Sequence, residues 1–393
     1  MNIVILGAGQ AAASLAAKVR ALGHDGPVTI IGDEPAPPYQ RPPLSKAYLL
    51  GDMDLDRLTL RAPDWWTDQR ITLRLGETAT AIDRARRVVV TDGGAYPYDQ
   101  LALTLGATPR RLPAAIGGAL PGVHVVRNLA DIAGLRPALT AGRRLVVIGG
   151  GYIGLEAAAV ARKLGLEVML VEAAPRILGR VAAPETADMI RALHRGHGVE
   201  IIEGVGIARI TGSEAADGVA LADGRHLPAD LVICGIGVSP ETALAEAAGL
   251  ALDNGIAVDA QGRTSDPAIW AAGDCASFPT PDGRLRLESV GNAIDMAETV
   301  AANMLGAGRD YLAKPWFWSD QFDAKLQIAG LNLGYDRVVT RPGSVWYYRA
   351  GRLIAVDALN DGRAYMIGKR LIESGKSVAP EDIVAAQDLK VLL

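Results

Sequence analysis

The sequence predicts an α/β protein with two nested Rossmann-like dinucleotide-binding domains and a C-terminal α+β domain. Two of the observations behind this prediction are glycine-rich turns, in "VILGAGQAAA" and in "VVIGGGYIGLE", each between a run of β-branched residues and an alanine-rich stretch. This pattern predicts a strand, a tight turn and a helix. The third observation is a change in composition and residue pattern from about residue 314, where aromatic residues cluster and strand-like alternation follows. That change indicates a separate domain.

The first glycine turn lies between a predicted strand at residues 2–6 and a predicted helix at residues 10–22. Gly7 and Gly9 are its first two glycines. Glycine lets the turn close and lets backbone N–H groups approach a pyrophosphate, which rests on the positive end of the helix. A second strand is expected at residues 28–31, so this segment predicts a first dinucleotide site.

Three segments complete the first unit. The loop "DEPAPPYQRPPLSK" is rich in proline, which fixes φ and removes hydrogen-bond donors, so we expect a stiff loop outside the sheet. The segment "RVVVTDGGAYPY" predicts a β-hairpin with a glycine turn. The segment "LALTLGATPRRLP" predicts a buried strand that ends in Gly106 and leaves the domain through proline.

The second glycine turn belongs to a βαβ unit expected between residues 144 and 172. Further strands are expected between residues 199 and 234, after which the chain returns to the first domain at "TSDPAIWAAGDCA". The expected domains are a first dinucleotide domain at residues 1–106 and 241–313, a second at residues 107–240, and the α+β domain at residues 314–393.

Composition excludes several classes of partner and location. The net charge of −4 gives no argument for nucleic acid or for a membrane surface. The N-terminus has no basic residue before its apolar run and is interrupted by glycine, which argues against a signal sequence. The apolar stretch 145–161 contains three consecutive glycines and a glutamate and is not a membrane span. Two cysteines, without a CxxC motif, predict no disulfides and a cytoplasmic location.

The position of the acidic residue that follows each glycine turn indicates which nucleotide that turn binds. Glu172 follows the second turn by about 20 residues, where a carboxylate takes the adenosine ribose hydroxyls. This carboxylate repels the 2′-phosphate of NADPH, so the second site should prefer NADH. Arg176 and Arg180 either soften that preference or are solvated loop cations. In the first unit the matching position is Gly32 and the acid is Asp33, a departure that leaves room for FAD.

The chain resembles the FAD-dependent NADH:ferredoxin reductases of bacterial oxygenase systems, which have a glutathione-reductase-like fold. The resemblance covers essentially the whole chain. It is carried by the segments "GAGQAAASLA", "GDEPAPPYQRPPLSKAYL", "GGGYIGLEAAA", "VEAAPRILGR", "CGIGVSPET", "IWAAGDCA", "ESVGNAID" and "PWFWSDQFDAKLQIAGL".

The resemblance implies a set of site residues. Lys46 would lie near the flavin N5, with Glu156 as its counterion, and Trp318, with Trp316 as a second candidate, would sit over the flavin ring. These roles make Lys46, Glu156 and Trp318 the expected catalytic residues. The FAD residues implied are Gly7, Gly9, Ala11, Ala12, Asp33, Arg41, Lys46, Ala79, Arg127, Asp274, Val290 and Trp318. The NADH residues implied are Gly149, Gly151, Ile153, Gly154, Glu156, Glu172, Arg180 and Gly237.

Structural alternatives stay open for these residues. Lys46 is otherwise a solvated cation after a proline-rich loop, and Glu156 a local cap. Trp316 and Trp318 are otherwise core or dimer-interface aromatics. Asp274 is otherwise a turn residue.

Sulfur and metal chemistry have little support in the sequence. The resemblance implies that a thiol-dependent oxidase would carry a cysteine shortly after the proline-rich loop, where this chain has "LSK". Electrons must therefore leave the flavin directly. Cys275 is expected to be a small packing residue. His194 and His197 lie three apart and are expected as exposed helix residues, and no metal site is expected.

The leading hypothesis is a reductase that takes hydride from NADH onto FAD and passes single electrons to a [2Fe–2S] ferredoxin. That ferredoxin would feed a cytochrome P450 or a Rieske oxygenase. The alternatives are an NADH oxidase or quinone-type reductase, and a non-catalytic redox-sensing protein that resembles apoptosis-inducing factor. Ferredoxins of this kind are acidic, so basic residues are candidates for docking: Arg284, Arg286, Lys314 and Lys325. Whether the chain forms a homodimer is open.

Overall fold

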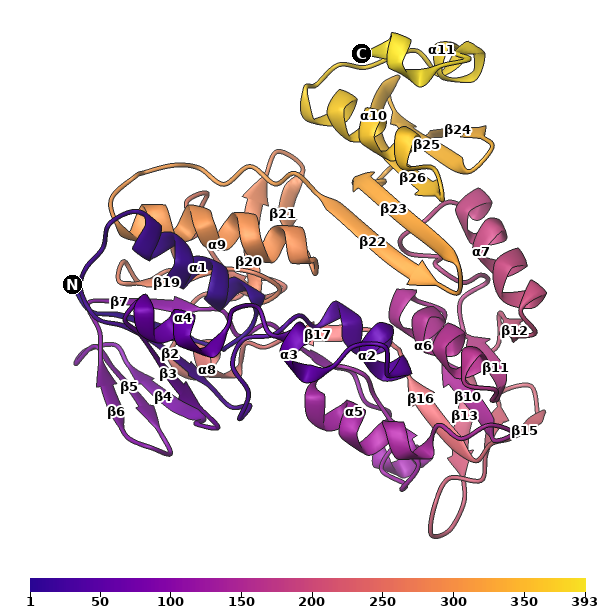
Figure 1. Ribbon diagram of the computed structural model, residues 1–393, viewed down its shortest axis with the longest axis horizontal. Coiled ribbons are helices and arrows are strands. Elements are labelled where there is room, and N and C mark those ends of the chain that lie inside the picture. Colours follow the sequence, from indigo (N-terminus) through magenta and orange to yellow (C-terminus); the bar gives the residue numbers. More distant parts are fainter. The chain divides into compact units, whose positions relative to one another are not determined.

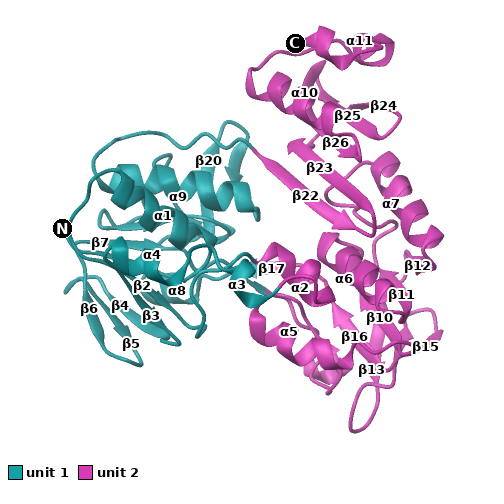
Figure 2. Ribbon diagram, in the orientation of Figure 1, with its two compact units in different colours: residues 1–40, 54–108, 239–314 teal, residues 41–53, 109–238, 315–393 magenta.

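The structure is a computed structural model that describes residues 1–393. It divides into two compact units, each built from three segments of chain (Figure 2). Unit 1 comprises residues 1–40, 54–108 and 239–314, and unit 2 comprises residues 41–53, 109–238 and 315–393. The chain passes between the units near two short strands, β8 (Ala107–Pro109) and β17 (Val238–Pro240). The division into three domains expected from the sequence stays a prediction.

Unit 1 is organised around a sheet of five parallel strands (Figure 1). Their order across the sheet is β19 (Ile269–Ala271), β7 (Gln100–Leu103), β1 (Ile3–Leu6), β2 (Val28–Gly32) and β3 (Ile71–Leu75). Every residue of the central strand β1 is buried. A parallel strand covered on both faces is a continuous apolar run, which is why this segment shows no polar alternation.

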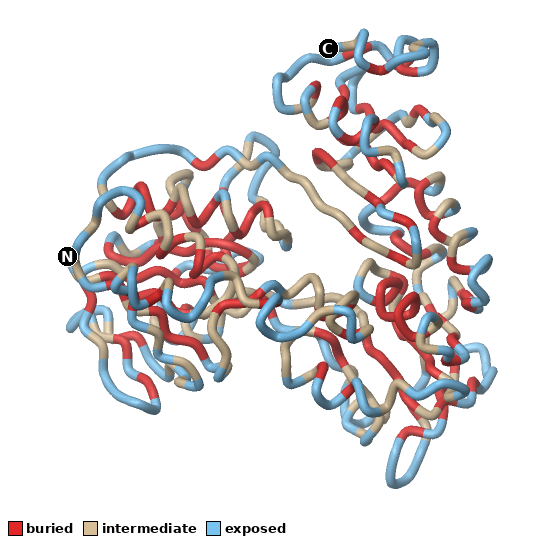
Figure 3. Tube along the Cα trace, in the orientation of Figure 1, coloured by how far each residue is buried: buried red, intermediate tan, exposed pale blue.

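Helices α1 (Gln10–Ala21) and α9 (Val290–Met304) pack side by side in unit 1 (Figure 1). Both helices are rich in alanine on their buried sides, and these small side chains let the two backbones approach closely. Their buried residues belong to the same apolar core as the parallel sheet, and Figure 3 shows buried chain throughout this interior.

The other elements of unit 1 are short. Two small sheets, β4–β5–β6 and β18–β20–β21, contain the strands β4 (Ala79–Asp83), β5 (Val88–Thr91), β6 (Ala95–Pro97), β18 (Ile256–Ala257), β20 (Ala276–Thr280) and β21 (Gly283–Leu285). The helices are α3 (Leu55–Leu58), α4 (Pro63–Asp68) and α8 (Ala243–Ala247).

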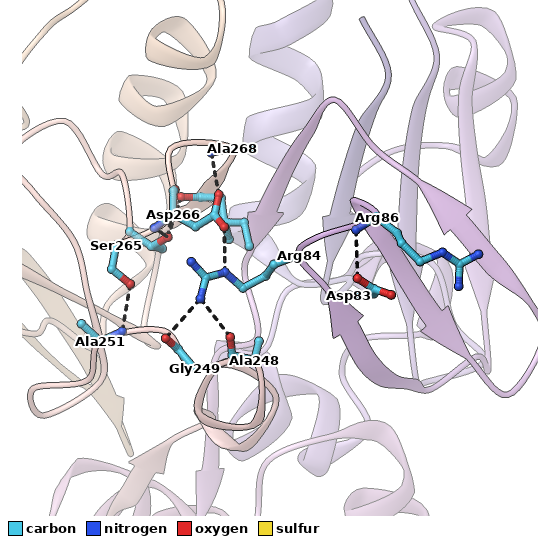
Figure 4. A network of polar contacts seen from close by, with 11 residues as sticks. Asp83, Arg84, Arg86, Ala248, Gly249, Ala251, Ser265, Asp266 and Ala268 are labelled. Carbon is cyan, nitrogen blue, oxygen red and sulfur yellow. Dashed lines mark hydrogen bonds and ion pairs between the residues drawn. The ribbon is translucent and has the colours of Figure 1, made fainter.

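Arg84, in the turn between β4 and β5, joins this hairpin to segments far away in the sequence (Figure 4). Its Nε donates to Asp266 Oδ2 over 2.7 Å, and its Nη1 donates to the carbonyl oxygens of Ala248 and Gly249 over 3.3 and 3.4 Å. Burial opposes the ionisation of Asp266, but hydrogen bonds from Arg84 and Ala268 outweigh it and hold the pKa below its usual value. The ion pair therefore persists at neutral pH.

Unit 2 contains a second sheet of five parallel strands. Their order is β12 (Glu200–Glu203), β11 (Glu167–Glu172), β10 (Arg144–Ile148), β16 (Leu231–Cys234) and β9 (Val123–His124). The accompanying helices are α5 (Leu129–Leu135), α6 (Tyr152–Lys163), α7 (Pro184–Gly196) and the short η2 (Ala114–Ile116) and η3 (Arg136–Ala138). A small antiparallel sheet follows, with strands β13 (Ile207–Thr211), β14 (Gly218–Leu221) and β15 (His226–Pro228).

The C-terminal part of unit 2 is an antiparallel sheet with helices packed on it. The strand order is β22 (Trp316–Gln321), β23 (Ala324–Gly330), β26 (Arg352–Leu359), β25 (Ser344–Arg349) and β24 (Arg337–Arg341). The helices are α10 (Gly362–Glu373), α11 (Pro380–Ala385) and η4 (Leu389–Leu392). Gly368 lets α10 lie close to this sheet, because a Cβ there would lie 2.5 Å from Val356 Cγ1.

A buried polar cluster joins this C-terminal sheet to α7. Thr186, on α7, donates to Asp357 Oδ2 over 2.8 Å, and the Tyr347 hydroxyl donates to the same oxygen. The backbone N–H of Ala183 in turn donates to the Tyr347 oxygen over 3.0 Å. Burial raises the pKa of Asp357 to about 6, although the two hydroxyl donors lower it in part.

The proline-rich loop lies outside the sheets, as expected, and contains a helical turn that was not predicted from the sequence. The proline-rich loop ends in two short helices, η1 (Pro42–Ser45) and α2 (Ala47–Leu50). Proline has the φ that the start of a helix requires and lacks only an N–H that would be unpaired there, so this loop ends in helices. No helix of the chain is both long and apolar enough to cross a bilayer.

We predict that Asp357→Asn flattens the pH dependence of stability between about pH 4 and pH 6. The folded pKa of Asp357 is about 6, above its usual value of 3.8. Its stabilising contribution is therefore complete below the unfolded pKa and is lost as the pH rises through the folded value. The difference of about two units corresponds to about 3 kcal/mol.

Urea unfolding of the wild type and the variant at several pH values measures this difference. Asp323→Asn is the control, because Asp323 is 84% exposed. The prediction would be contradicted if the free energy of unfolding changed with pH by the same slope in the wild type and in Asp357→Asn.

Candidate functional site

The first glycine turn connects β1 to α1 in unit 1. Gly7 has φ +93°, and a Cβ at this residue would lie 2.3 Å from the carbonyl oxygen of Thr104. Gly9 is the N-cap of α1 and makes no side-chain cap. The first N–H groups of α1 are therefore free of side-chain partners from the cap, as a helix that binds a pyrophosphate requires.

The end of β2 explains why this unit departs from the usual fingerprint. A Cβ at Gly32 would lie 2.5 Å from the Cβ of Ala8, in the glycine turn. No acid fits at that position, and the carboxylate comes one residue later, at the exposed Asp33. Asp33, the acid found from the sequence, therefore lies just beyond the sheet. In this exposed position its carboxylate remains accessible to a larger nucleotide.

Five more FAD residues implied by the resemblance lie in the same unit: Ala11, Ala12, Ala79, Asp274 and Val290. Gly273 follows β19 and packs against α1, because a Cβ there would lie 3.1 Å from the Cβ of Ala11. Asp274 comes directly after it. Val290 is the first residue of α9, whose N-cap Ser289 accepts a hydrogen bond from Asn292 N–H. Ala12 is fully buried in α1, and Ala79 begins β4.

The second glycine turn repeats the geometry of the first in unit 2. Gly149 has φ +106°, and a Cβ there would lie 2.4 Å from the carbonyl oxygen of Gly235. Gly151 is the N-cap of α6 and makes no side-chain cap. A Cβ at Gly154 would lie 2.1 Å from the Gly149 carbonyl oxygen, so only glycine lets the helix lie this close to the turn. The predicted βαβ unit at residues 144–172 is present as β10, α6 and β11.

Glu172 is held in place at the end of β11 by two backbone donors. Gly150 N–H donates to Oε2 and Ala174 N–H donates to Oε1, both over 2.7 Å. A carboxylate oxygen accepts more than one hydrogen bond, so both oxygens keep capacity for ribose hydroxyls. The rigid negative charge disfavours a 2′-phosphate at this position.

The remaining NADH residues implied by the resemblance surround this turn. Ile153, in the first turn of α6, is 39% exposed although it is apolar. Gly237 has φ +96°, and a Cβ there would lie 3.5 Å from Arg180 Nη2, so these two residues are neighbours. An exposed apolar side chain beside an uncapped helix start is suited to packing against a ligand.

A buried ion pair lies between η1 and α6 in unit 2. Lys46 Nζ donates to Glu156 Oε2 over 2.8 Å, and the side chains are 15% and 3% exposed. Ser45 Oγ donates to the same oxygen over 2.5 Å, and Ser319 Oγ on β22 donates to Oε1 over 2.6 Å. The lysine is therefore not a freely solvated cation, and the glutamate is not a local cap.

Opposing effects act on the ionisation of Glu156. Burial raises the pKa of its carboxyl, while the Lys46 ammonium and the hydroxyls of Ser319 and Ser45 lower it. The carboxylate thus depends on its donors for its charge, and removal of any donor raises the pKa further.

Two aromatic residues implied by the resemblance are adjacent on β22. The rings of Trp316 and Trp318 are stacked, with centroids 5.6 Å apart and planes 19° apart. Phe317 lies on the other side of the strand, against Tyr152 at the start of α6, with centroids 4.8 Å apart. Alternate residues of a strand point to opposite faces, so this strand presents the tryptophans on one face only.

Arg41 and Arg127 are also brought together in unit 2. Arg41 Nη1 donates to the backbone carbonyl oxygen of Arg127 over 2.9 Å. Arg127 N–H donates to Asp131 Oδ2, within the capping box of α5. These two contacts hold the backbone N–H and carbonyl of Arg127 in place.

Sequence reasoning missed three polar residues of the Glu156 region: Ser45, Ser319 and Gln321. It also placed His194 wrongly, because this residue is fully buried on α7 rather than exposed. Its Nε2 lies 2.7 Å from Gln321 Oε1, and it packs edge-on against Phe322, 5.0 Å between ring centroids. The period of α7 contains a signal for its burial, since Ala187 and Ile190 on the same helix face are also buried.

Two further expectations concern cysteine and docking cations. Burial raises the pKa of both Cys234 and Cys275 to about 11, so Cys275 is a packing residue as expected.

Arg286 is an unsuitable docking residue, because its side chain is 10% exposed and pairs with Glu288. Arg284 also turns inward and donates to the carbonyl oxygen of Val258 over 2.8 Å.

Comparisons with known proteins cover the whole chain. Residues 1–297 match the family described as pyridine nucleotide-disulphide oxidoreductase, and residues 316–393 match the family described as reductase C-terminal. Rhodocoxin reductase from Rhodococcus erythropolis is 42% identical over 404 residues, which cover 100% of this chain and 94% of that protein. Putidaredoxin reductase CamA from Pseudomonas putida is 43% identical over 393 residues, with 96% and 93% covered.

A solved structure matches the fold over its full length. The reductase in the crystal structure of the covalent putidaredoxin reductase–putidaredoxin complex superposes with a TM-score of 0.95 at 41% identity. The match covers 100% of this chain and 97% of that chain.

We predict that substitution of one glycine in each turn separates the two nucleotide sites. Gly7→Ala should reduce the bound flavin, because the new Cβ meets the Thr104 carbonyl. Gly149→Ala should keep the flavin but weaken NADH binding by at least about tenfold, since the backbone of its turn must move. Flavin absorbance and NADH titration measure these effects.

Gly224→Ala is the matched control, because Gly224 also has a positive φ, +90°, but nothing lies within 4 Å of a Cβ there. A loss of flavin in Gly149→Ala as large as in Gly7→Ala would show that the sites are assigned wrongly.

Proposed function

The chain belongs to the pyridine nucleotide-disulphide oxidoreductase family, among its ferredoxin reductases, and we propose that it transfers electrons from NADH through FAD to a [2Fe–2S] ferredoxin. The observation that carries this proposal is the repeated glycine turn: each parallel sheet has its own turn, and each turn leads into a helix without a side-chain cap. One chain therefore offers a site for each of two dinucleotides. The ferredoxin would supply a cytochrome P450 or a Rieske oxygenase.

The residues of unit 1 fit FAD. The turn at Gly7 is closed by the Thr104 carbonyl, and the start of α1 at Gly9 supplies N–H groups for a pyrophosphate. We assign the adenosine end to Asp33, and a ribityl hydroxyl to Asp274. The FAD-binding domain in this proposal comprises residues 1–106 and 241–313.

The residues of unit 2 fit NADH. The turn at Gly149 and the start of α6 at Gly151 suit the pyrophosphate, and Ile153 offers an apolar contact. We assign the ribose hydroxyls to Glu172, which makes NADH the preferred donor over NADPH. The NADH-binding domain in this proposal comprises residues 107–240, and the C-terminal domain residues 314–393.

When bound, FAD supplies a carrier that accepts two electrons together from a nicotinamide and releases them singly to a one-electron acceptor. The protein contributes charge and orientation. Glu156 holds Lys46 Nζ in an ion pair, so that a positive charge at a fixed position is available to offset negative charge on a reduced ring. We propose that Lys46 approaches the flavin and that Trp318 covers it.

No thiol relay enters this proposal. Cys234 and Cys275 are both buried, and their raised pKa values keep them as thiols at neutral pH. Electrons then pass from the flavin to the partner protein directly. Two buried free thiols also support a cytoplasmic location, which we propose for this chain.

We predict that the purified protein is yellow, retains FAD, and after reduction by NADH transfers single electrons rapidly to at least one member of a panel of [2Fe–2S] ferredoxins. Stopped-flow absorbance follows the flavin and the iron–sulfur cluster separately. Slow transfer to every ferredoxin, combined with rapid NADH-driven oxygen consumption in the absence of a partner, would favour an oxidase instead. Slow transfer to every ferredoxin combined with an NADH-dependent change of oligomeric state would favour a redox sensor.

We also predict that Glu172→Arg shifts the preference from NADH toward NADPH. The substitution replaces a charge that repels the 2′-phosphate with one that attracts it, so the ratio of kcat/KM for the two donors should change by at least about tenfold. Glu167→Arg, at the exposed opposite end of β11, is the matched control for the charge change itself. An unchanged ratio in Glu172→Arg would refute the assignment of the ribose contact.

A further inference from the structure

The Glu156 carboxylate is the end point of a line of buried side chains that continues beyond Ser319. Gln321 Nε2 lies 2.9 Å from Ser319 Oγ, and His194 Nε2 lies 2.7 Å from Gln321 Oε1. His194, Gln321 and Ser319 are each no more than 1% exposed. The line connects α7, β22 and α6, which are separate elements of unit 2.

The direction of every hydrogen bond in this line follows from the carboxylate. An ionised Glu156 only accepts, so Ser319 donates its hydroxyl proton to Oε1. The Ser319 oxygen then accepts from the amide nitrogen of Gln321, which leaves the amide oxygen to face His194. An amide oxygen also only accepts, so His194 donates from Nε2.

The state of His194 agrees with that direction. Burial lowers the pKa of His194 to about 4, so the ring is neutral at pH 7 and has a single proton to donate. Its Nδ1 is buried without a hydrogen-bond partner. Because the neutral ring has one donor, the row of hydrogen bonds begins at His194. Hydrogen bonds that are aligned toward a carboxylate polarise one another.

We propose that this line of side chains is a positioning chain for the charge pair of the reductase. Its members are His194, Gln321 and Ser319, none of which reaches a reacting atom; they act through Glu156 and Lys46. This proposal rests on the proposed function, because it assigns residues that set the position of the lysine ammonium used with FAD.

The position of Ser319 on β22 gives the chain a second effect. Ser319 and Gln321 lie on one face of the strand, and Trp316 and Trp318 lie on the other. The hydrogen bond from Ser319 to Glu156 therefore sets the register of the tryptophan pair relative to α6. This contact therefore acts on both the ion pair and the aromatic pair.

The experiment measures the pKa of Glu156 directly in the FAD-loaded holoprotein. Protein labelled with ¹³C-glutamate is titrated by NMR, and the Glu156 carboxyl signal is assigned by its loss in Glu156→Gln. The other ionisable groups that face this carboxyl are Lys46 and Tyr152, which stay unchanged in every test variant. Neither NADH nor ferredoxin is needed, so the result is independent of the proposed acceptor.

Ser319→Ala should raise the pKa of Glu156 by about one unit, the effect of one hydrogen bond lost from a charged group. His194→Leu should raise it by less, because the chain is shortened only at its far end. The double variant should match Ser319→Ala alone, because His194 acts only through Ser319. His194→Gln, which keeps a donor near the position of Nε2, should restore the wild-type value.

His197→Leu is the matched control, because His197 stacks on Phe322 near His194 but lies outside the chain. Flavin reduction by NADH should slow by about tenfold in Ser319→Ala and be unchanged in His197→Leu. Absence of a pKa shift in Ser319→Ala, or a His194→Leu shift of equal size with and without Ser319, would overturn the proposal.

Discussion

The structure around the proposed chemistry depends on one buried carboxylate. Glu156 is 2% exposed on α6, a helix whose neighbouring positions are filled by alanine, and an unpaired charge there would cost several kcal/mol. Donors from two other segments take the place of water: Ser45 at the end of η1 with Lys46 directly after it, and Ser319 from β22. Satisfying this charge therefore fixes a loop, a helix and a C-terminal strand of unit 2 at one point.

The two glycine turns have the same steric requirement in the two parallel sheets: neither leaves room for a Cβ. In each, a carbonyl oxygen from the neighbouring strand's end occupies the space where a Cβ would lie, at Gly7 by Thr104 and at Gly149 by Gly235. Both helices then begin with free N–H groups. The difference lies after the second strand of each unit, where Gly32 packs on Ala8 in one and Glu172 receives two backbone donors in the other.

Because the second turn holds a carboxylate in a fixed position and the first does not, the two sites differ in the nucleotide they suit. The ribose with free hydroxyls that we propose for the second site would meet this carboxylate, whereas the first site has its acid beyond the sheet. The cysteines contribute to neither, since both are buried thiols with raised pKa values. The disulphide chemistry in the family's description thus has no counterpart among these residues, and direct electron transfer to a protein partner is the consistent alternative.

The sequence by itself determined the features that neighbouring residues produce: the strand, turn and helix at residues 144–172, the uncapped helix starts, and the acids that follow. These are short-range consequences of glycine, β-branched residues and alanine. The pairing of Lys46 with Glu156 was found only through the resemblance. Tertiary structure alone decided the burial of His194 and its link to Gln321, because a hydrogen bond between distant segments depends on how helix and strand pack, and local periodicity does not encode that contact.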